Sequence, residues 1–211
     1  MIYPSVQTPE RFVAAYLYLI ARKILGHPLN YFEVIPVDIE CYFYQQSWHP
    51  DDTAQRHPLQ TRFNRLYFYR MGKSNTLRPV KRMGAGIALS MGSYTLAVLL
   101  RAIRDGDKYI DGTAKVAAYL FHRFSRLDYS TASVNERLEI IQQMEQLEDV
   151  VNLSDKPVQG PVWTTVRVGL NAKRDYKDRR YRFLIEATRS GYKGKKQLME
   201  NNGRRKNNQQ K

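Results

Sequence analysis

The stretch VDIECYF, residues 37–43, places a carboxylate among aliphatic and aromatic side chains. Its composition is typical of a half-buried β-strand, in which Glu40 and Tyr42 face one side while Ile39 and Cys41 face the other. A carboxylate in such surroundings must be paired with a cation, protonated or used in chemistry, because burial of an unpaired charge is costly. Glu40 is therefore the first candidate for a functional side chain.

Arg101 is the second candidate, because it ends the apolar run LAVLL, residues 96–100. A buried guanidinium requires a carboxylate or a phosphate as its partner. The two candidates could satisfy each other, and periodicity alone favours a structural ion pair between Glu40 and Arg101 over a role in chemistry.

Other reactive centres are scarce in the sequence. His49 and His57 share one polar segment with Asp51 and Asp52, but their spacing of eight residues matches no familiar metal motif. The single cysteine, Cys41, rules out a disulfide within the chain and a Cys-rich zinc site. The sequence also lacks the glycine-rich motifs of nucleotide binding and the G-x-S-x-G motif. We therefore expect no metal site and no cofactor.

The charge balance points to a polyanionic partner. The 211 residues include 34 Lys or Arg and 20 Asp or Glu, a net charge of +14. Residues 193–211 hold seven Lys or Arg and one Glu, so +8 remains for the rest of the chain. Nucleic acid is the simplest partner for such a chain, and a solvated basic surface is the alternative. In residues 62–70 arginines alternate with aromatic residues, as in a surface that grips nucleic acid or an amphipathic strand with exposed arginines.

The elements that must position these side chains follow from local patterns. A helix is expected from Thr8 as N-cap and Pro9 to Gly26, and its apolar run is too short to span a membrane. Ser133 and Glu136 form a capping box for a second helix. Glycines at 84, 86 and 92 indicate tight turns or a bulge. Strands are expected at 31–44, 64–70, 78–83, 84–90, 94–103, 161–170 and 179–188, helices at 111–125 and 133–148, and a loop at 45–62.

These elements predict an α+β fold with one domain, a curved and mostly antiparallel sheet surrounded by helices. Residues 1–192 form this domain, and 193–211 are expected to be a basic disordered tail.

Several short pieces resemble the alkyladenine (3-methyladenine or methylpurine) DNA glycosylase family over about residues 21–192. They occur in the family's order and spacing. The pieces are ARKILGHPL (21–29), VDIECY (37–42), DDTAQRH (51–57), QTRFNR (60–65), NTL (75–77), AVLLRAI (97–103), DGTAKVAAYL (111–120), VRVGL (166–170) and YRFLI (181–185).

The resemblance implies a role for each matching residue. Glu40 stands where the family's glutamate activates the water that attacks the sugar C1′, and Tyr42 where a tyrosine stacks on the flipped-out base. Arg101 stands near the phosphate that flanks this nucleotide. His57, with His49 as the alternative, matches a loop histidine that contacts the base or backbone. The match at 60–65 also implies that Asn64 and Arg65 bind DNA.

The hairpin after NTL departs from the family pattern. Gapless alignment puts Val80 where the family has a second stacking tyrosine, Met83 at the residue that wedges into the duplex, and Ser90 at an asparagine near the pocket. Alternatively, Tyr67 or Tyr69 supplies the second ring.

The resemblance implies a monofunctional enzyme of DNA base-excision repair. It would flip an alkylated purine out of double-stranded DNA and hydrolyse its N-glycosidic bond without a metal or cofactor. We expect a monomer in the cytoplasm, associated with the nucleoid in a bacterium. The alternatives are a catalytically weak or inactive nucleic-acid-binding member of the same fold, and a hydrolase that acts on RNA or a nucleotide.

Overall fold

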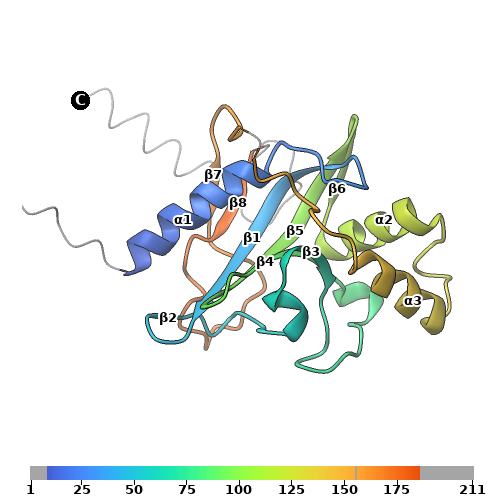
Figure 1. Cartoon of the computed structure of the whole chain (residues 1–211), viewed down its shortest axis with the longest axis horizontal. Coiled ribbons are helices and arrows are strands. Elements are labelled where there is room, and N and C mark those ends of the chain that lie inside the picture. Colours follow the sequence, from blue (N-terminus) through green and yellow to red (C-terminus); the bar gives the residue numbers. More distant parts are fainter. Residues whose placement is uncertain (1–8, 155, 186–211) are drawn as a thin grey trace, which may run out of the picture.

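The computed structural model describes residues 9–154 and 156–185. Thr8, the end of the strand expected at 179–188, and residues 193–211 lie outside the described residues. Three helices pack against one open antiparallel sheet (Figure 1), which confirms the α+β prediction, but they cover one of its faces rather than surround it. The helices are α1 (Pro9–Ile24), α2 (Thr113–Ser125) and α3 (Val134–Met144), and two short 3-10 turns are η1 (Pro58–Thr61) and η2 (Val80–Arg82). The strands are β1 (Ile35–Gln45), β2 (His49–Pro50), β3 (Phe63–Phe68), β4 (Ala85–Leu89), β5 (Thr95–Asp105), β6 (Lys108–Asp111), β7 (Trp163–Thr165) and β8 (Arg182–Leu184).

The two longest strands, β1 and β5, form the centre of the sheet. The strand order is β3-β4-β5-β1-β8-β7, with β2 paired to β1 and β6 paired to β5. Glu40 lies opposite Leu99 and Tyr42 opposite Ala97, so the two stretches that carry the candidate residues are direct neighbours. Every strand pair among the described residues is antiparallel.

One face of the sheet packs against the helices and forms the main core. Ile39 and Cys41 of β1 point into this face, together with Val98 and Leu100 of β5. Val13 and Leu17 of α1 and Val116 and Leu120 of α2 belong to the same buried cluster. In Figure 1, α1 lies near one end of the sheet, while α2 and α3 lie near the other. The 2-residue period of the strands therefore decides which side chains the helices cover.

The opposite face carries a smaller, tyrosine-rich cluster. Tyr42, Tyr67 and Tyr69 lie there with Ala97 and Leu99. Gly86 makes room for one of these rings, because a Cβ atom at Gly86 would lie 2.6 Å from the Tyr67 hydroxyl oxygen. The glycine expected at a bulge is thus a position of close packing, and the register of β4 against β5 is regular there.

The first strand begins later than its composition predicts. Tyr31 and Glu33 have φ of 70° and 56°, residues 30–32 form a turn, and β1 starts at Ile35. Its register with β5 is irregular between Pro36 and Ile39, which agrees with the bend expected at Pro36.

Three further expectations about strands differ from the structure. Residues 78–83 are not a strand: Pro79 lacks a backbone N–H and precedes the 3-10 turn η2. In 161–170 only Trp163–Thr165 is a strand, because Gly169 has φ of 73° and the chain turns. The loop expected at 45–62 contains β2 and η1.

The two later helices confirm the expected patterns with shorter bounds. Ser133 Oγ accepts from the Glu136 backbone N–H, and a Glu136 side-chain oxygen accepts from that of Ser133, which is the predicted capping box. α3 ends at Met144, and α2 starts at Thr113 with Gly112 as its N-cap.

Candidate active site

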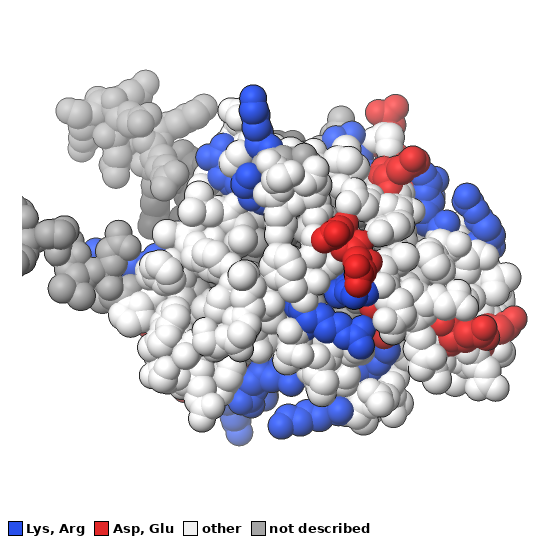
Figure 2. Space-filling model, in the orientation of Figure 1, with Lys and Arg blue, Asp and Glu red and all other residues white. Residues whose placement is uncertain are grey.

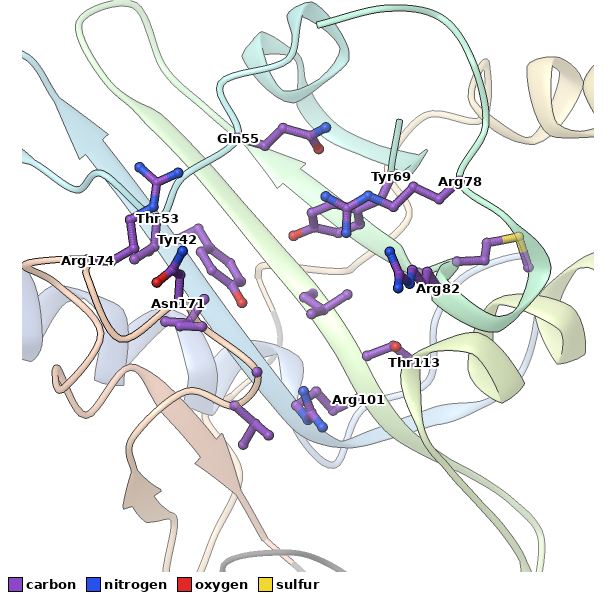
Figure 3. Close-up of a pocket in the computed structure, with 16 residues that line it drawn as sticks. Tyr42, Thr53, Gln55, Tyr69, Arg78, Arg82, Arg101, Thr113, Asn171 and Arg174 are labelled. Atoms are coloured by element: carbon purple, nitrogen blue, oxygen red, sulfur yellow. The ribbon is translucent and has the colours of Figure 1, made fainter. Parts of the chain in front are cut away.

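A cavity of about 360 Å³ opens on the tyrosine-rich face, and we call it the tyrosine pocket. Figure 3 shows Tyr42 and Tyr69 on opposite sides of it and Gln55 at one end. Tyr42 comes from β1, Leu99 and Arg101 from β5, and Thr113 from the start of α2. The connection between β3 and β4 and residues 168–174 complete the walls. Segments far apart in the sequence therefore meet above the strands that carry Glu40 and Arg101.

Glu40 lies directly behind the wall of the tyrosine pocket. Its side chain is 0% exposed, and its Oε1 accepts from the Val168 backbone N–H at 2.8 Å. The same oxygen lies 3.1 Å from Arg101 Nη1, while Oε2 accepts from the Tyr42 hydroxyl at 2.9 Å. The ion pair favoured by periodicity is therefore present. All three partners of this carboxylate line the pocket. Glu40 therefore links three segments of the pocket wall through its hydrogen bonds and its ion pair.

Tyr42 is positioned by two contacts, one to its hydroxyl from Glu40 and one to its ring from Arg167. Burial, followed by the charge of Glu40, raises the pKa of Tyr42 well above its usual value, so the phenol stays neutral and donates to the carboxylate. The Arg167 guanidinium carbon lies 4.8 Å from the centre of the Tyr42 ring. Arg167 is itself fixed by Asp51 Oδ2 at 2.6 Å and by the Cys41 carbonyl at 3.2 Å.

Tyr69 provides the second ring of the pocket. The ring is 8% exposed, and the Arg78 guanidinium carbon lies 5.3 Å from its centre. Val80, the residue that gapless alignment places at this position, is 38% exposed and lines a separate hollow against α3. Of the two alternatives stated for the second ring, the structure places Tyr69 on the pocket wall.

The histidine and the serine expected near the base lie elsewhere and make local contacts. His57 caps η1, because its Nδ1 accepts from the Leu59 N–H at 3.2 Å, and its Nε2 lies 3.1 Å from the Ser74 carbonyl. Ser90 Oγ bonds the Gln60 carbonyl and accepts from the Leu96 N–H at 2.9 Å.

The alternative histidine, His49, is 0% exposed and lies among four aromatic rings. These rings belong to Phe43, Trp48, Tyr176 and Tyr181. From the same loop, Gln55 lines the pocket where a histidine was expected.

Residues expected to bind DNA also contact other parts of the chain. Asn64 has φ of 52°, and its side chain bonds the Val151 carbonyl at 2.8 Å and the Val151 N–H at 3.0 Å. Arg65 forms an ion pair with Glu148. Met83 lines the pocket but is 0% exposed. A side chain that enters a duplex must protrude, so Met83 is not placed as a wedge.

The pocket wall is strongly basic. The arginines that line it are Arg78, Arg82, Arg101 and Arg174. The N-terminus of α2 adds partial positive charge beside Thr113 through the helix dipole, and Gly112 provides no side-chain cap for its N–H groups. No Asp or Glu lines this pocket within the described chain. The wall is therefore suited to anionic groups such as phosphate.

The sequence indicated no role for three of these arginines, Arg78, Arg82 and Arg174. Arg78 and Arg82 belong to the segment read as a strand, and Arg174 to the loop NAKRDYK, residues 171–177. The sequence signal for this basic wall was the presence of arginines close to glycines at 78–84 and 169–174. Nothing in the spacing of these two segments shows that they meet.

Charge on the rest of the surface is less concentrated. In the view of Figure 2, Lys and Arg are spread over the described surface, whereas Asp and Glu lie mainly in the right half. Within residues 9–154 and 156–185, no cluster of three or more His, Cys, Asp or Glu could hold a metal ion. None of the described helices is long and apolar enough to cross a bilayer.

Comparison with known proteins adds no assignment. A scan against models of protein families finds no match, and a search of curated proteins finds no relative. The resemblance to alkyladenine DNA glycosylases therefore rests on the residues quoted above.

Proposed function

We propose that the protein is a monofunctional DNA glycosylase that releases alkylated purines, of the 3-methyladenine type, from double-stranded DNA. The observation that carries this proposal is the position of Glu40 beneath a pocket with two tyrosine rings and a basic wall. Tyr42 and Tyr69 offer aromatic surfaces for a flipped-out base, and base–aromatic stacking contributes about 1–3 kcal/mol per base.

In the proposed reaction a water adds to C1′ of the nucleotide while the C1′–N bond to the purine breaks. The bonding electrons leave with the base, and Glu40 takes up the water proton. An ionised carboxylate has about four acceptor sites, and three groups occupy Glu40: Tyr42, Arg101 and the Val168 N–H. In the proposal the remaining site accepts from a water that enters with the substrate, and because Glu40 is 0% exposed the wall in front of it must open for that water. Arg101 and the other pocket arginines would hold the flanking phosphates.

A second candidate is a nucleic-acid-binding protein of this fold without catalysis. The observation that favours it is the complete burial of Glu40 in an ion pair with Arg101. In that case the carboxylate only positions Arg101 and Tyr42.

Base release from methylated duplex DNA tests the proposal. We expect the native chain to release 3-methyladenine, and Glu40→Gln to release it about 10²–10⁴-fold more slowly while still binding DNA, because the general base is lost. The measurement is chromatography of free bases after single-turnover incubation.

The matched control is Glu145→Gln. Glu145 is also a buried glutamate paired with an arginine, since its Oε2 lies 2.7 Å from Arg70 Nη2, but it does not line the tyrosine pocket. Loss of release in both variants would indicate a general effect of breaking a buried ion pair. Absence of release by the native chain, with DNA binding intact, would favour the binding protein.

A further inference from the structure

Gln55 has a fixed orientation at one end of the tyrosine pocket. Its side-chain Nε2 donates to the Arg70 carbonyl at 2.6 Å and to the Gly72 carbonyl at 2.8 Å. A flipped amide would place its oxygen against both carbonyl oxygens, so these contacts decide which end is nitrogen. The amide therefore presents its Oε1 as an acceptor in one defined position.

That oxygen has no partner in the protein. Gln55 Oε1 is buried and accepts no hydrogen bond from any described residue. Figure 3 shows Gln55 at the end of the pocket near Tyr69, and both residues line it. An unsatisfied buried acceptor is costly, and a ligand that donates a hydrogen bond removes this cost.

The Tyr69 hydroxyl is a second group of this kind. It is buried and donates to no described residue, and the adjacent Tyr67 hydroxyl opposes the effect of burial on its pKa. Burial raises the pKa of Tyr69 above its ordinary value, so the hydroxyl stays protonated and can donate. The pocket thus combines one group that only accepts with one that donates, which suits the polar edge of a nucleobase.

We propose that Gln55 is a specificity-determining residue that accepts a hydrogen bond from the exocyclic amino group of a purine. This inference rests on the proposed base-binding role of the tyrosine pocket and narrows its substrate class. 3-Methyladenine offers this amino group at C6. A base with an oxo group at C6 places an acceptor against the acceptor of Gln55, and an etheno bridge removes the amino hydrogens. The pocket therefore selects 6-aminopurines over 6-oxopurines and ethenoadenine.

The test uses two free bases, 3-methyladenine and 3-methylhypoxanthine, which carry an amino and an oxo group at C6. Each base is titrated into the purified full-length chain in a calorimeter, which gives two dissociation constants. We expect the native chain to bind 3-methyladenine about tenfold more tightly, because one correctly paired polar group discriminates by about this factor. In Gln55→Ala the two constants should become equal within about twofold.

Gln143→Ala is the matched control, because Gln143 is an exposed glutamine of α3 that does not line the tyrosine pocket. It should keep the native ratio. Equal binding of the two bases by the native chain, tighter binding of 3-methylhypoxanthine, or no binding of either base would overturn the proposal without reference to any variant.

The affinity ratio of the two free bases and base release from DNA test the two proposals separately. Base release with loss of the tenfold ratio would remove the role of Gln55 and leave the glycosylase in place. The ratio without base release would leave a base-binding pocket that selects 6-aminopurines in a protein without the proposed catalysis.

Discussion

Each buried carboxylate near the site has its own arginine. Asp38 pairs with Arg182 and Glu40 with Arg101, although both carboxylates belong to one strand. The two partners come from β8 and β5, on either side of β1. Burial raises the pKa of Asp38, and the hydrogen bond and charge of Arg182 oppose this shift. Pairing with arginine offsets the desolvation cost of these buried carboxylates. Burial alone therefore does not distinguish a structural glutamate from a catalytic one.

His49 should make the stability of the protein depend on pH. Burial lowers the pKa of His49 below its ordinary value, an effect that the charge of Asp51 partly offsets. Neither ring nitrogen has a hydrogen-bond partner among the described residues. Below pH 6.5, the ordinary value, the unfolded imidazole binds a proton that the folded one does not. The free energy of unfolding therefore falls as the pH decreases.

We expect His49→Phe, which preserves an aromatic ring among its neighbours, to lose less stability than the native chain between about pH 7.5 and pH 5. Urea unfolding at several pH values measures this difference. The pKa of His57 is also lowered, with burial as the main cause, so His57→Phe shows how much of the pH dependence comes from the second histidine. An unchanged pH dependence in His49→Phe would contradict the assignment.

At the scale of elements, one buried ion pair joins two of the loops that line the pocket, the loop after β2 and the loop that follows β7. Asp51 follows β2, and Arg167 precedes the Val168 N–H that donates to Glu40. Both side chains are 0% exposed, with 2.6 Å between Asp51 Oδ2 and Arg167 Nη1. The Arg167 Nη2 also donates to the Tyr176 carbonyl at 2.7 Å. This pair therefore positions the loop whose Val168 N–H donates to Glu40.

We predict that Asp51→Asn lowers the free energy of unfolding by about 3–5 kcal/mol, because it leaves the Arg167 charge buried without its counter-ion. Asp52→Asn is the control: Asp52 is partly exposed, and its distance to Arg174 is 3.7 Å, so this change should cost about 1 kcal/mol or less. Equal losses in urea unfolding would show that the buried pair contributes no more than the surface pair.

At the scale of the whole molecule, net charge should govern affinity for DNA. The chain carries +14, and residues 193–211 contribute +6 of it. Binding to an undamaged duplex should therefore weaken steeply between about 50 and 200 mM salt, because each phosphate that the protein neutralises releases counter-ions.

Replacing Lys195, Lys196, Arg204 and Arg205 by Gln should make the plot of log affinity against log salt shallower, by up to about 0.9 for each phosphate that the variant no longer neutralises. Fluorescence anisotropy at several salt concentrations gives the slope. The same variant should keep the ratio of the two free-base affinities, because that ratio arises in the pocket. A native slope near zero would argue against an electrostatic DNA-binding surface.

The sequence by itself determined the local features: the α+β class, the two strands that carry Glu40 and Arg101, the capping box of α3 and the shared face of Glu40 and Tyr42. These follow from local periodicity and end signals, which depend on neighbouring residues only. It also indicated that Glu40 and Arg101 need partners, because both are charged residues in apolar strands.

Only the tertiary structure decided what surrounds them. Residues 78–84 and 166–174 have no regular period, so their meeting at one pocket depends on the path of the folded chain. For the same reason Tyr69 and Gln55 line the pocket, while His57, Ser90 and Val80 lie outside it. Periodicity predicts which face of a strand a side chain occupies, but loops of irregular backbone determine what stands opposite that face.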